Sequence, residues 1–189
     1  MAPILENPEL RSQVLPLPVA AYQQLGELGL LPRRTELIRG IIFERPVKTP
    51  LFCYVESLLY RTAAPALGEG FILGLGQPLS LRDSCPEPDL AVFAGVPKQF
   101  LRQHPYTAKL VIEIAISTEA LDRVKAAIYA EAGVEEYWIV LPDRGVIERF
   151  TQPGATGYAQ HDVIAQGDTA VSLTFPAFEV NLAGMLAEG

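Results

Sequence analysis

The spacing of hydrophobic residues along this chain alternates between a helical and an extended period. Apolar residues recur every three to four positions in residues 19–31 and 50–66, which predicts two amphipathic helices. Between them, residues 35–46 alternate apolar and polar side chains around Arg39 and Gly40, a pattern that predicts a β-hairpin. We therefore expect the chain to open with a helix, a hairpin and a longer helix.

The middle of the chain carries short apolar tracts that are typical of a sheet. Residues 71–76, 77–83 and 88–93 are separated by Gly, Pro and Asp, which predicts three consecutive strands. Residues 110–116, LVIEIAI, form an almost unbroken apolar run, as expected for a central strand that is covered on both faces.

A strand, helix and strand are expected next. The helix runs from Glu119 to Ala132 in this interpretation, because Gly133 would end it, and residues 135–142 form the following strand. This order predicts a βαβ crossover, in which the two strands are parallel.

The last part of the chain predicts an antiparallel β-meander and a closing helix. Three alternating tracts lie at 146–151, 157–164 and 169–175, and a short helical pattern covers 178–186. The expected fold is one α/β domain over residues 1–189, with a mixed β-sheet core flanked by helices and an additional antiparallel β-meander.

Composition narrows the possible functions. The chain has 189 residues, a net charge of −7 and no apolar run near the roughly 18 residues of a membrane span. We expect no membrane insertion and, without a secretory signal pattern at the start, a cytoplasmic location. The negative charge argues against coating nucleic acid through bulk electrostatics. A local basic stretch at 33–48 is either a solvated hairpin edge or a binding patch.

Two carboxylates stand where a buried sheet would not ordinarily hold them. Asp89 follows Pro88 and leads into an apolar tract, and Glu113 interrupts the run 110–116. A buried carboxylate is costly unless it is paired, hydrogen-bonded or bound to a cation. Asp89 alone could orient a turn, and Glu113 could pair with Lys109, Lys125 or an arginine. Alternatively, the two acids lie together at the carboxyl ends of adjacent strands and bind Mg²⁺ or Mn²⁺.

Lys125 follows on the next helix, with Tyr129 four residues later on the same face. A lysine there could position or help to deprotonate a water molecule, or it could be an ordinary surface residue. His104 and His161 have no metal-ligand spacing, and Trp138 is expected in the core, so these three stay outside the predicted site.

The order of helix, ELIRG hairpin, helix, PEPDLAVF, VIEIAIS, lysine-bearing helix and GVEEYWIV resembles the Uma-type family of restriction-endonuclease-like proteins, a branch of the PD-(D/E)XK nuclease superfamily. The likeness covers residues from about Pro18 to Leu186. It implies a restriction-endonuclease-like fold, DNA as substrate, a divalent cation (Mg²⁺ or Mn²⁺) and a homodimer. It also implies a site in which the metal ligands and the lysine are Glu36, Asp89, Glu113 and Lys125.

The chain departs from the family pattern at two positions. The superfamily lysine normally stands two residues after the second acid, where this chain has Ala115, so Lys125 would replace it. Similar sequences commonly carry a histidine where this one has Phe52. Besides a metal-dependent endonuclease, two functions stay open: a nuclease-fold protein that binds nucleic acid or protein without cutting, and a structural homo-oligomer. The latter predicts a large apolar surface patch and no converging carboxylates.

Overall fold

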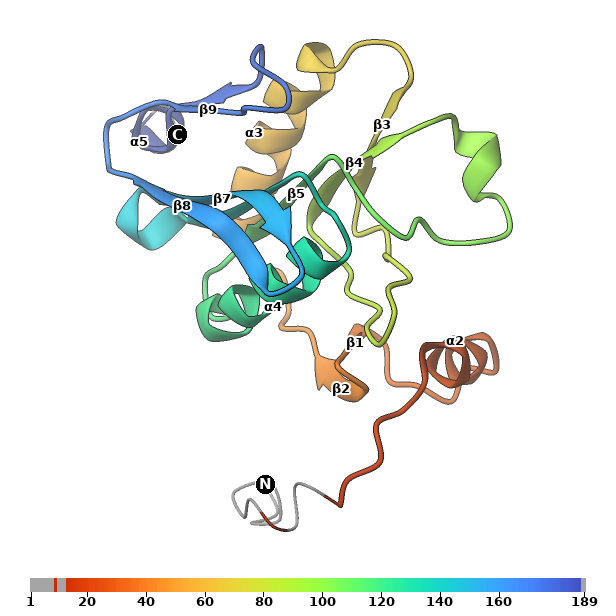
Figure 1. The fold of residues 1–189 in the computed structure, drawn as a ribbon. Helices are drawn as coiled ribbons and strands as arrows, with labels where there is room; N and C mark the ends of the chain where they lie inside the picture. Colours follow the sequence, from red (N-terminus) through yellow and green to blue (C-terminus); the bar gives the residue numbers. More distant parts are fainter. Residues whose placement is uncertain (1–8, 10–12, 188–189) are drawn as a thin grey trace.

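A six-stranded mixed sheet forms the centre of the computed structural model, which describes residue 9 and residues 13–187 (Figure 1). The strand order is β3-β4-β5-β6-β7-β8. The strands are β3 (Phe71–Leu75), β4 (Leu90–Ala94), β5 (Leu110–Ile114), β6 (Glu136–Leu141), β7 (Val146–Gly154) and β8 (Gly157–Ile164). Only the pair β5 and β6 is parallel within this sheet. The predicted mixed α/β sheet core is confirmed, as are its parallel strands.

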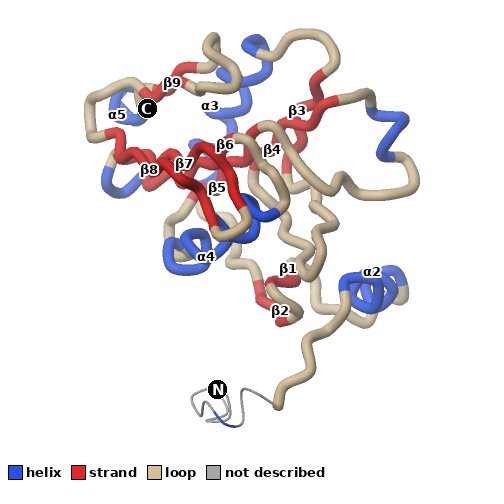
Figure 2. The backbone as a smooth tube through the Cα atoms, viewed as in Figure 1, coloured by secondary structure: helices blue, strands red, loops and turns tan. Residues whose placement is uncertain are grey.

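Two helices cover opposite faces of this sheet. Helix α3 (Pro50–Ala66) packs on one face, and α4 (Glu119–Glu131), which connects β5 to β6, packs on the other (Figures 1 and 2). Alternate residues of β5 and β6 point to the two faces. Ile112 and Trp138 belong to the core under α3, whereas Val111 and Tyr137 belong to the core under α4. Glu113 has the same parity as Val111 and therefore faces α4.

A small hairpin lies beside the α4 face. It consists of β1 (Thr35–Ile38) and β2 (Ile41–Glu44), with Arg39 and Gly40 between them at φ angles of 51° and 75°. Two successive residues with positive φ are typical of a tight type I′ hairpin turn. Backbone hydrogen bonds link Leu37 to Cys85 in both directions, at 2.7 and 3.3 Å, and fix the hairpin against the segment before β4.

The first helix, α2 (Val19–Glu27), is shorter than the predicted 19–31. It ends because Gly29 adopts a left-handed φ of 68° and the amide of Leu30 bonds back to the carbonyl of Leu25. The apolar spacing continues past this point, but Leu30 is exposed and does not extend the buried face.

The predicted strand at 77–83 is wrong. The apolar side chains of Leu79 and Leu81 are buried, as the pattern indicated. Their backbone amides, however, bond to the carbonyls of Pro86 and Ser84, which follow directly along the chain. The segment is a loop that closes on itself and joins no sheet.

The predicted meander is only partly correct. Strands β7 and β8 form an antiparallel pair that extends the central sheet. The third tract contains only β9 (Ala170–Val171), which pairs with β10 (Glu179–Val180) in a separate two-stranded sheet. The closing helix, α5 (Leu182–Ala187), therefore begins later than the predicted 178, because β10 occupies the first residues of that stretch.

A buried carboxylate holds the C-terminal segment on the sheet. Glu136, which is fully buried, accepts hydrogen bonds from Trp138 Nε1 at 2.7 Å, Ser172 Oγ at 2.7 Å and the amide of Thr174 at 3.0 Å. Trp138 in turn stacks on Phe178, with 5.2 Å between ring centroids. Trp138 is thus a core residue, as the sequence predicts.

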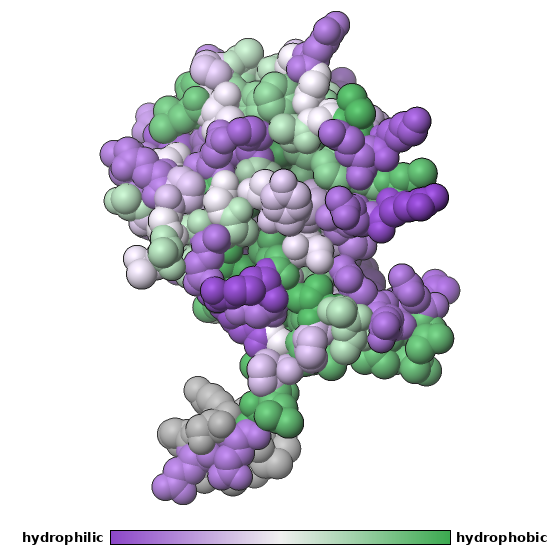
Figure 3. Space-filling view, turned by 45° about the vertical axis from the view of Figure 1, so that its right-hand side comes forward, coloured by the Kyte–Doolittle hydropathy of each residue, from purple (hydrophilic) through white to green (hydrophobic). Residues whose placement is uncertain are grey.

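The face of the molecule seen in Figure 3 lacks the large apolar patch that a purely structural assembly predicts. Hydrophobic and hydrophilic side chains alternate over the face seen in Figure 3, without one continuous apolar area. None of the helices in the described part of the chain is long and apolar enough to cross a membrane.

Glu136→Ala should destabilise the protein by about 3 kcal/mol or more, because it leaves several buried donors without an acceptor. The matched control is Glu135→Ala, which removes the adjacent and half-exposed carboxylate that pairs with Lys109 and should cost less than about 1 kcal/mol. Urea unfolding followed by tryptophan fluorescence measures both. Equal losses for the two variants would contradict the role of Glu136.

Candidate functional site

Strand pairing brings Asp89 and Glu113 together. In the antiparallel register of β4 and β5, Leu90 pairs with Ile112, so the residue before Leu90 stands opposite the residue after Ile112. Asp89 Oδ2 accepts a hydrogen bond from the amide of Ile114 at 2.8 Å. We expected both acids at the carboxyl ends of their strands. This is wrong for Asp89, which precedes β4, because the two strands run in opposite directions.

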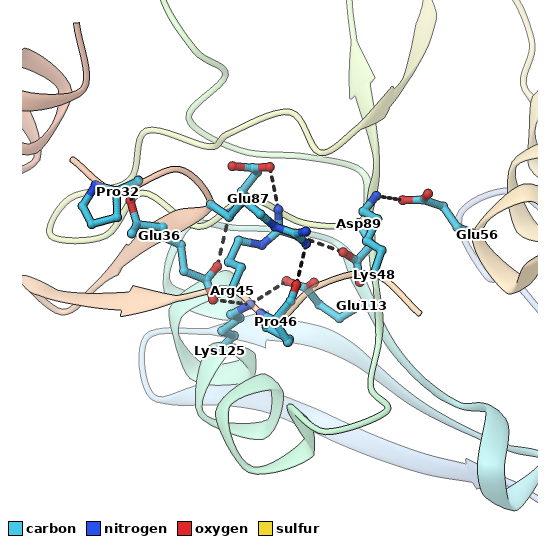
Figure 4. A network of polar contacts seen from close by, with 12 residues as sticks. Pro32, Glu36, Arg45, Pro46, Lys48, Glu56, Glu87, Asp89, Glu113 and Lys125 are labelled. Carbon is cyan, nitrogen blue, oxygen red and sulfur yellow. Dashed lines mark hydrogen bonds and ion pairs between the residues drawn. The ribbon is translucent and has the colours of Figure 1, made fainter. Parts of the chain in front are cut away.

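Lys125 lies at the centre of the acidic cluster. Its Nζ is 2.9 Å from Glu36 Oε1 and 3.1 Å from Glu113 Oε1 (Figure 4). It also lies 3.3 Å from Asp122 Oδ1. The side chain is only 4% exposed, so Lys125 is not an ordinary surface residue of α4. Helix propensity alone predicts that Lys125→Ala folds normally, but the burial contradicts this, because alanine would leave three buried carboxylates without their cation.

Four elements supply the cluster. Glu36 comes from β1, Asp89 lies just before β4, Glu113 comes from β5, and Lys125 comes from α4. The expected pairing of Glu113 with Lys125 is therefore confirmed, and it does not decide whether the cluster also binds a cation. Lys109, the other lysine considered, pairs with Glu135 instead.

Asp122 and Tyr129 complete the α4 side of the cluster. Tyr129 Oη donates to Glu113 Oε1 at 2.8 Å, and Thr118 Oγ1 donates to Asp122 Oδ2 at 2.6 Å. The predicted site did not include Asp122, which is only 2% exposed. Its spacing of three residues before Lys125 places both on one helix face, and this was the available signal.

Arg45 is the second cation of the site and was not predicted as part of it. Its guanidinium lies 2.9 Å from Asp89 Oδ1 and 2.5 Å from Glu87 Oε1, and its side chain is 13% exposed. The interpretation of residues 33–48 as a solvated hairpin edge therefore fails for Arg45, which points inward from the end of β2. Its partner acids lie more than 40 residues away, so local patterning could not reveal the pairing.

All four predicted site residues line one small cavity of about 70 Å³, together with Arg45 and Asp122. This volume holds a few water molecules or a hydrated cation, and it is too small for a nucleotide. Phe52 lies on the cavity wall, where Lys48 Nζ stands 4.8 Å from its ring centroid.

Ala115 explains why the lysine comes from a helix. It is 4% exposed and packs in the hydrophobic core under α4, and its amide bonds to Val140 at 2.9 Å. A lysine at this position would displace apolar packing, whereas Lys125 reaches the same acids from the α4 side.

The cavity has more acid than base. Four buried carboxylates face Lys125 and Arg45, so an excess of two negative charges would remain among these six groups if every one were ionised. Glu44, Arg34 and Lys48 also line the cavity and reduce the excess to one. Burial, with Glu113 adding to it, raises the pKa of Asp89 well above its ordinary value. Burial likewise raises the pKa of Glu36, and that of Asp122 to about 6. Burial tends to lower the pKa of Lys125, but the surrounding carboxylates outweigh it and the net shift is upward, so this lysine stays charged.

The donor chemistry fits a hard divalent cation, which prefers carboxylate oxygens and neutralises such an excess of charge. The side chains are nevertheless arranged as ion pairs: within residues 13–187 and residue 9, no three His, Cys, Asp or Glu side chains are grouped to hold a metal ion. Cation binding at this site therefore requires Lys125 or Arg45 to give up part of its carboxylate contacts.

The pKa of Asp122 predicts a pH dependence for the metal-free protein. A folded-state pKa of about 6, above the ordinary 3.8, means that the folded state holds this proton more tightly than the unfolded state. The resulting stability is complete below pH 3.8 and is lost as pH rises through 6. Asp122→Asn cannot ionise, so its stability relative to wild type should increase between pH 4 and pH 7.

Urea unfolding in EDTA at several pH values measures this difference. The exposed Asp143 provides the control, because Asp143→Asn should keep a constant difference from wild type across the same range. A flat or falling difference for Asp122→Asn would show that burial does not raise its pKa.

Comparisons with known proteins agree with this architecture. The family model Uma2, described as "Putative restriction endonuclease", matches residues 21–183. A crystal structure from Anabaena variabilis ATCC 29413, described as a "putative nuclease belonging to DUF820", superposes with a TM-score of 0.68 at 16% identity. The alignment covers 90% of this chain and 99% of that one, and at this identity it shows a shared fold. None of the curated proteins compared with the chain matches it. The match over most of its length shows that the chain belongs to the Uma2 family, whose description is "Putative restriction endonuclease".

Proposed function

We propose that this protein is an endonuclease that hydrolyses DNA phosphodiester bonds with the help of Mg²⁺ or Mn²⁺. The observation that carries the proposal is the meeting of Glu36, Asp89 and Glu113 around Lys125 in one small cavity. Family membership supports the nuclease class. Buried carboxylates with an excess of negative charge support a divalent cation as cofactor.

In this proposal Asp89 and Glu113 hold the cation and Glu36 assists. The cation would supply Lewis-acid polarisation of the phosphate and a more acidic bound water. In the metal-free arrangement, the carboxylates around Lys125 raise its pKa and keep it charged, which suits it to positioning a water molecule. It orients the carboxylates and stabilises negative charge that develops on the phosphate. Water would form the new P–O bond and lose a proton, while the bond to the leaving sugar oxygen breaks and that oxygen takes up a proton, so that the two transfers balance.

A second candidate is a protein of the same fold that binds nucleic acid without cutting it. The ion pairs of Asp89 with Arg45 and of Glu113 with Lys125 favour this candidate, since they occupy the oxygens that a metal would need. Cytoplasmic location and homodimerisation remain predictions for either candidate.

Cleavage of supercoiled plasmid DNA in Mg²⁺ or Mn²⁺ separates the two candidates. The wild type should nick or linearise the plasmid, and Asp89→Asn and Glu113→Gln should each slow cleavage at least about a hundredfold, which corresponds to about 2.7 kcal/mol of barrier. Glu135→Gln, the exposed control, should cut at the wild-type rate. A wild type that cuts no DNA would favour the non-cutting candidate, and an active Glu113→Gln would remove Glu113 from the site.

Metal binding should also stabilise the folded protein, independently of any substrate. At a hundredfold excess over the dissociation constant, Mn²⁺ contributes about 2.7 kcal/mol. For a domain of this size that raises the melting temperature by about 5 to 10 °C. Asp89→Asn should abolish most of this response, whereas Glu135→Gln should keep it. Differential scanning calorimetry measures the shift, and an equal response in Asp89→Asn would contradict the proposed ligand set.

A further inference from the structure

A second cleft, of about 1040 Å³, lies next to the acidic cavity. Its walls come from α2, from the segment that leads into β1, from residues 78–85 and from residues 100–106 in the connection between β4 and β5. Arg34 lines both this cleft and the acidic cavity. The two hollows therefore share one wall, and a long ligand could lie in the cleft and reach the acids.

The cleft gathers positive charge that no carboxylate neutralises, although the Arg34 guanidinium donates a hydrogen bond to the carbonyl of Pro46. Arg33, Arg34 and Arg102 line it, all three are exposed, and none forms an ion pair with any residue of the described part. Glu27 is the single acid among the residues that line the cleft. In a chain of net charge −7, this is a local site where phosphates would be attracted.

Aromatic side chains stand beside these arginines. Tyr106 is 71% exposed, and Phe100 and His104 line the same wall. A basic groove with an exposed aromatic ring is the combination that binds single-stranded nucleic acid, because the groove follows the phosphates and the ring stacks on a base. A duplex keeps its bases stacked on one another and has little use for such a ring.

Arg34 connects the cleft to the acidic cavity through the backbone. Its φ of 67° is a left-handed conformation that a side chain other than glycine rarely adopts, and such residues are found at functional sites. Its carbonyl accepts a 2.7 Å hydrogen bond from the amide of Arg45, whose guanidinium contacts Asp89. Only Arg45 would therefore stand between a phosphate bound by Arg34 and Asp89, one of the proposed metal ligands.

We propose that this cleft binds an unpaired DNA strand, with phosphates on Arg33, Arg34 and Arg102 and a base stacked on Tyr106. The strand passes Arg34 and presents one phosphodiester at the mouth of the acidic cavity, which is itself too small for a nucleotide. The substrate of the proposed nuclease is then DNA with a single-stranded segment next to the cut. This last step rests on the proposed function, whereas strand binding does not.

The test measures binding without cleavage. Fluorescence anisotropy in EDTA follows a labelled 20-nucleotide oligo(dT) and a blunt 20-base-pair duplex on full-length Glu113→Gln protein. The single strand should bind at least about tenfold more tightly than the duplex. Tyr106→Ala should weaken single-strand binding about tenfold. Arg102→Ala should weaken it and lower the slope of log K against log salt by about 0.7.

Matched controls come from α3, where Tyr60 and Arg61 are exposed and line neither hollow. Tyr60→Ala and Arg61→Ala should bind like the parent protein. Duplex binding as tight as single-strand binding, or equal effects of Tyr106→Ala and Tyr60→Ala, would overturn the proposal. If the strand binds through Tyr106 but the wild type never cuts, only the nuclease assignment fails. If the wild type cuts but the cleft variants bind normally, only the cleft assignment fails.

Discussion

The ion pairs of the buried Lys125 organise this molecule. A single ammonium group contacts carboxylates from β1, β5 and its own helix, so it ties the hairpin, the central sheet and α4 to one point. A buried charge is tolerated only with close partners. Three residues of β2 are exposed, whereas Leu37 and Ile38 of β1 are buried in the core. The position of the hairpin therefore depends on this apolar packing, on the polar contacts of Lys125 and on the Leu37–Cys85 backbone bridge.

The same contacts give the site two possible charge arrangements. In one, protons and the two cations Lys125 and Arg45 balance the four buried acids. In the other, which the proposed function requires, a divalent cation would take the place of the protons and of part of the ion pairing. The upward shifts in the pKa of Asp89, Glu36 and Asp122 belong to the first arrangement, because burial disfavours their charged forms. Metal binding should therefore release protons from this cluster.

The sequence could predict the central sheet because its signals are local. The apolar run around Glu113, the glycine after α4 and the alternation in β1 and β2 each act over a few residues. The predicted strand at 77–83 failed because burial of Leu79 and Leu81 resembles a strand pattern while their hydrogen bonds close a loop. The third tract of the meander failed because its partner, β10, comes from a later segment.

The site was predictable in part for a similar reason. Asp89 lies just before a recognisable strand, Glu113 lies within another, and Lys125 lies on a recognisable helix. The role of Arg45, in contrast, depends on a contact across 44 residues that no local pattern reveals. The most direct test of the account is a crystal structure with Mn²⁺, using anomalous scattering to locate the ion. The account predicts one strong peak within about 2.5 Å of carboxylate oxygens of both Asp89 and Glu113. No peak there at saturating Mn²⁺, with the Arg45–Asp89 and Lys125–Glu113 pairs intact, would contradict it.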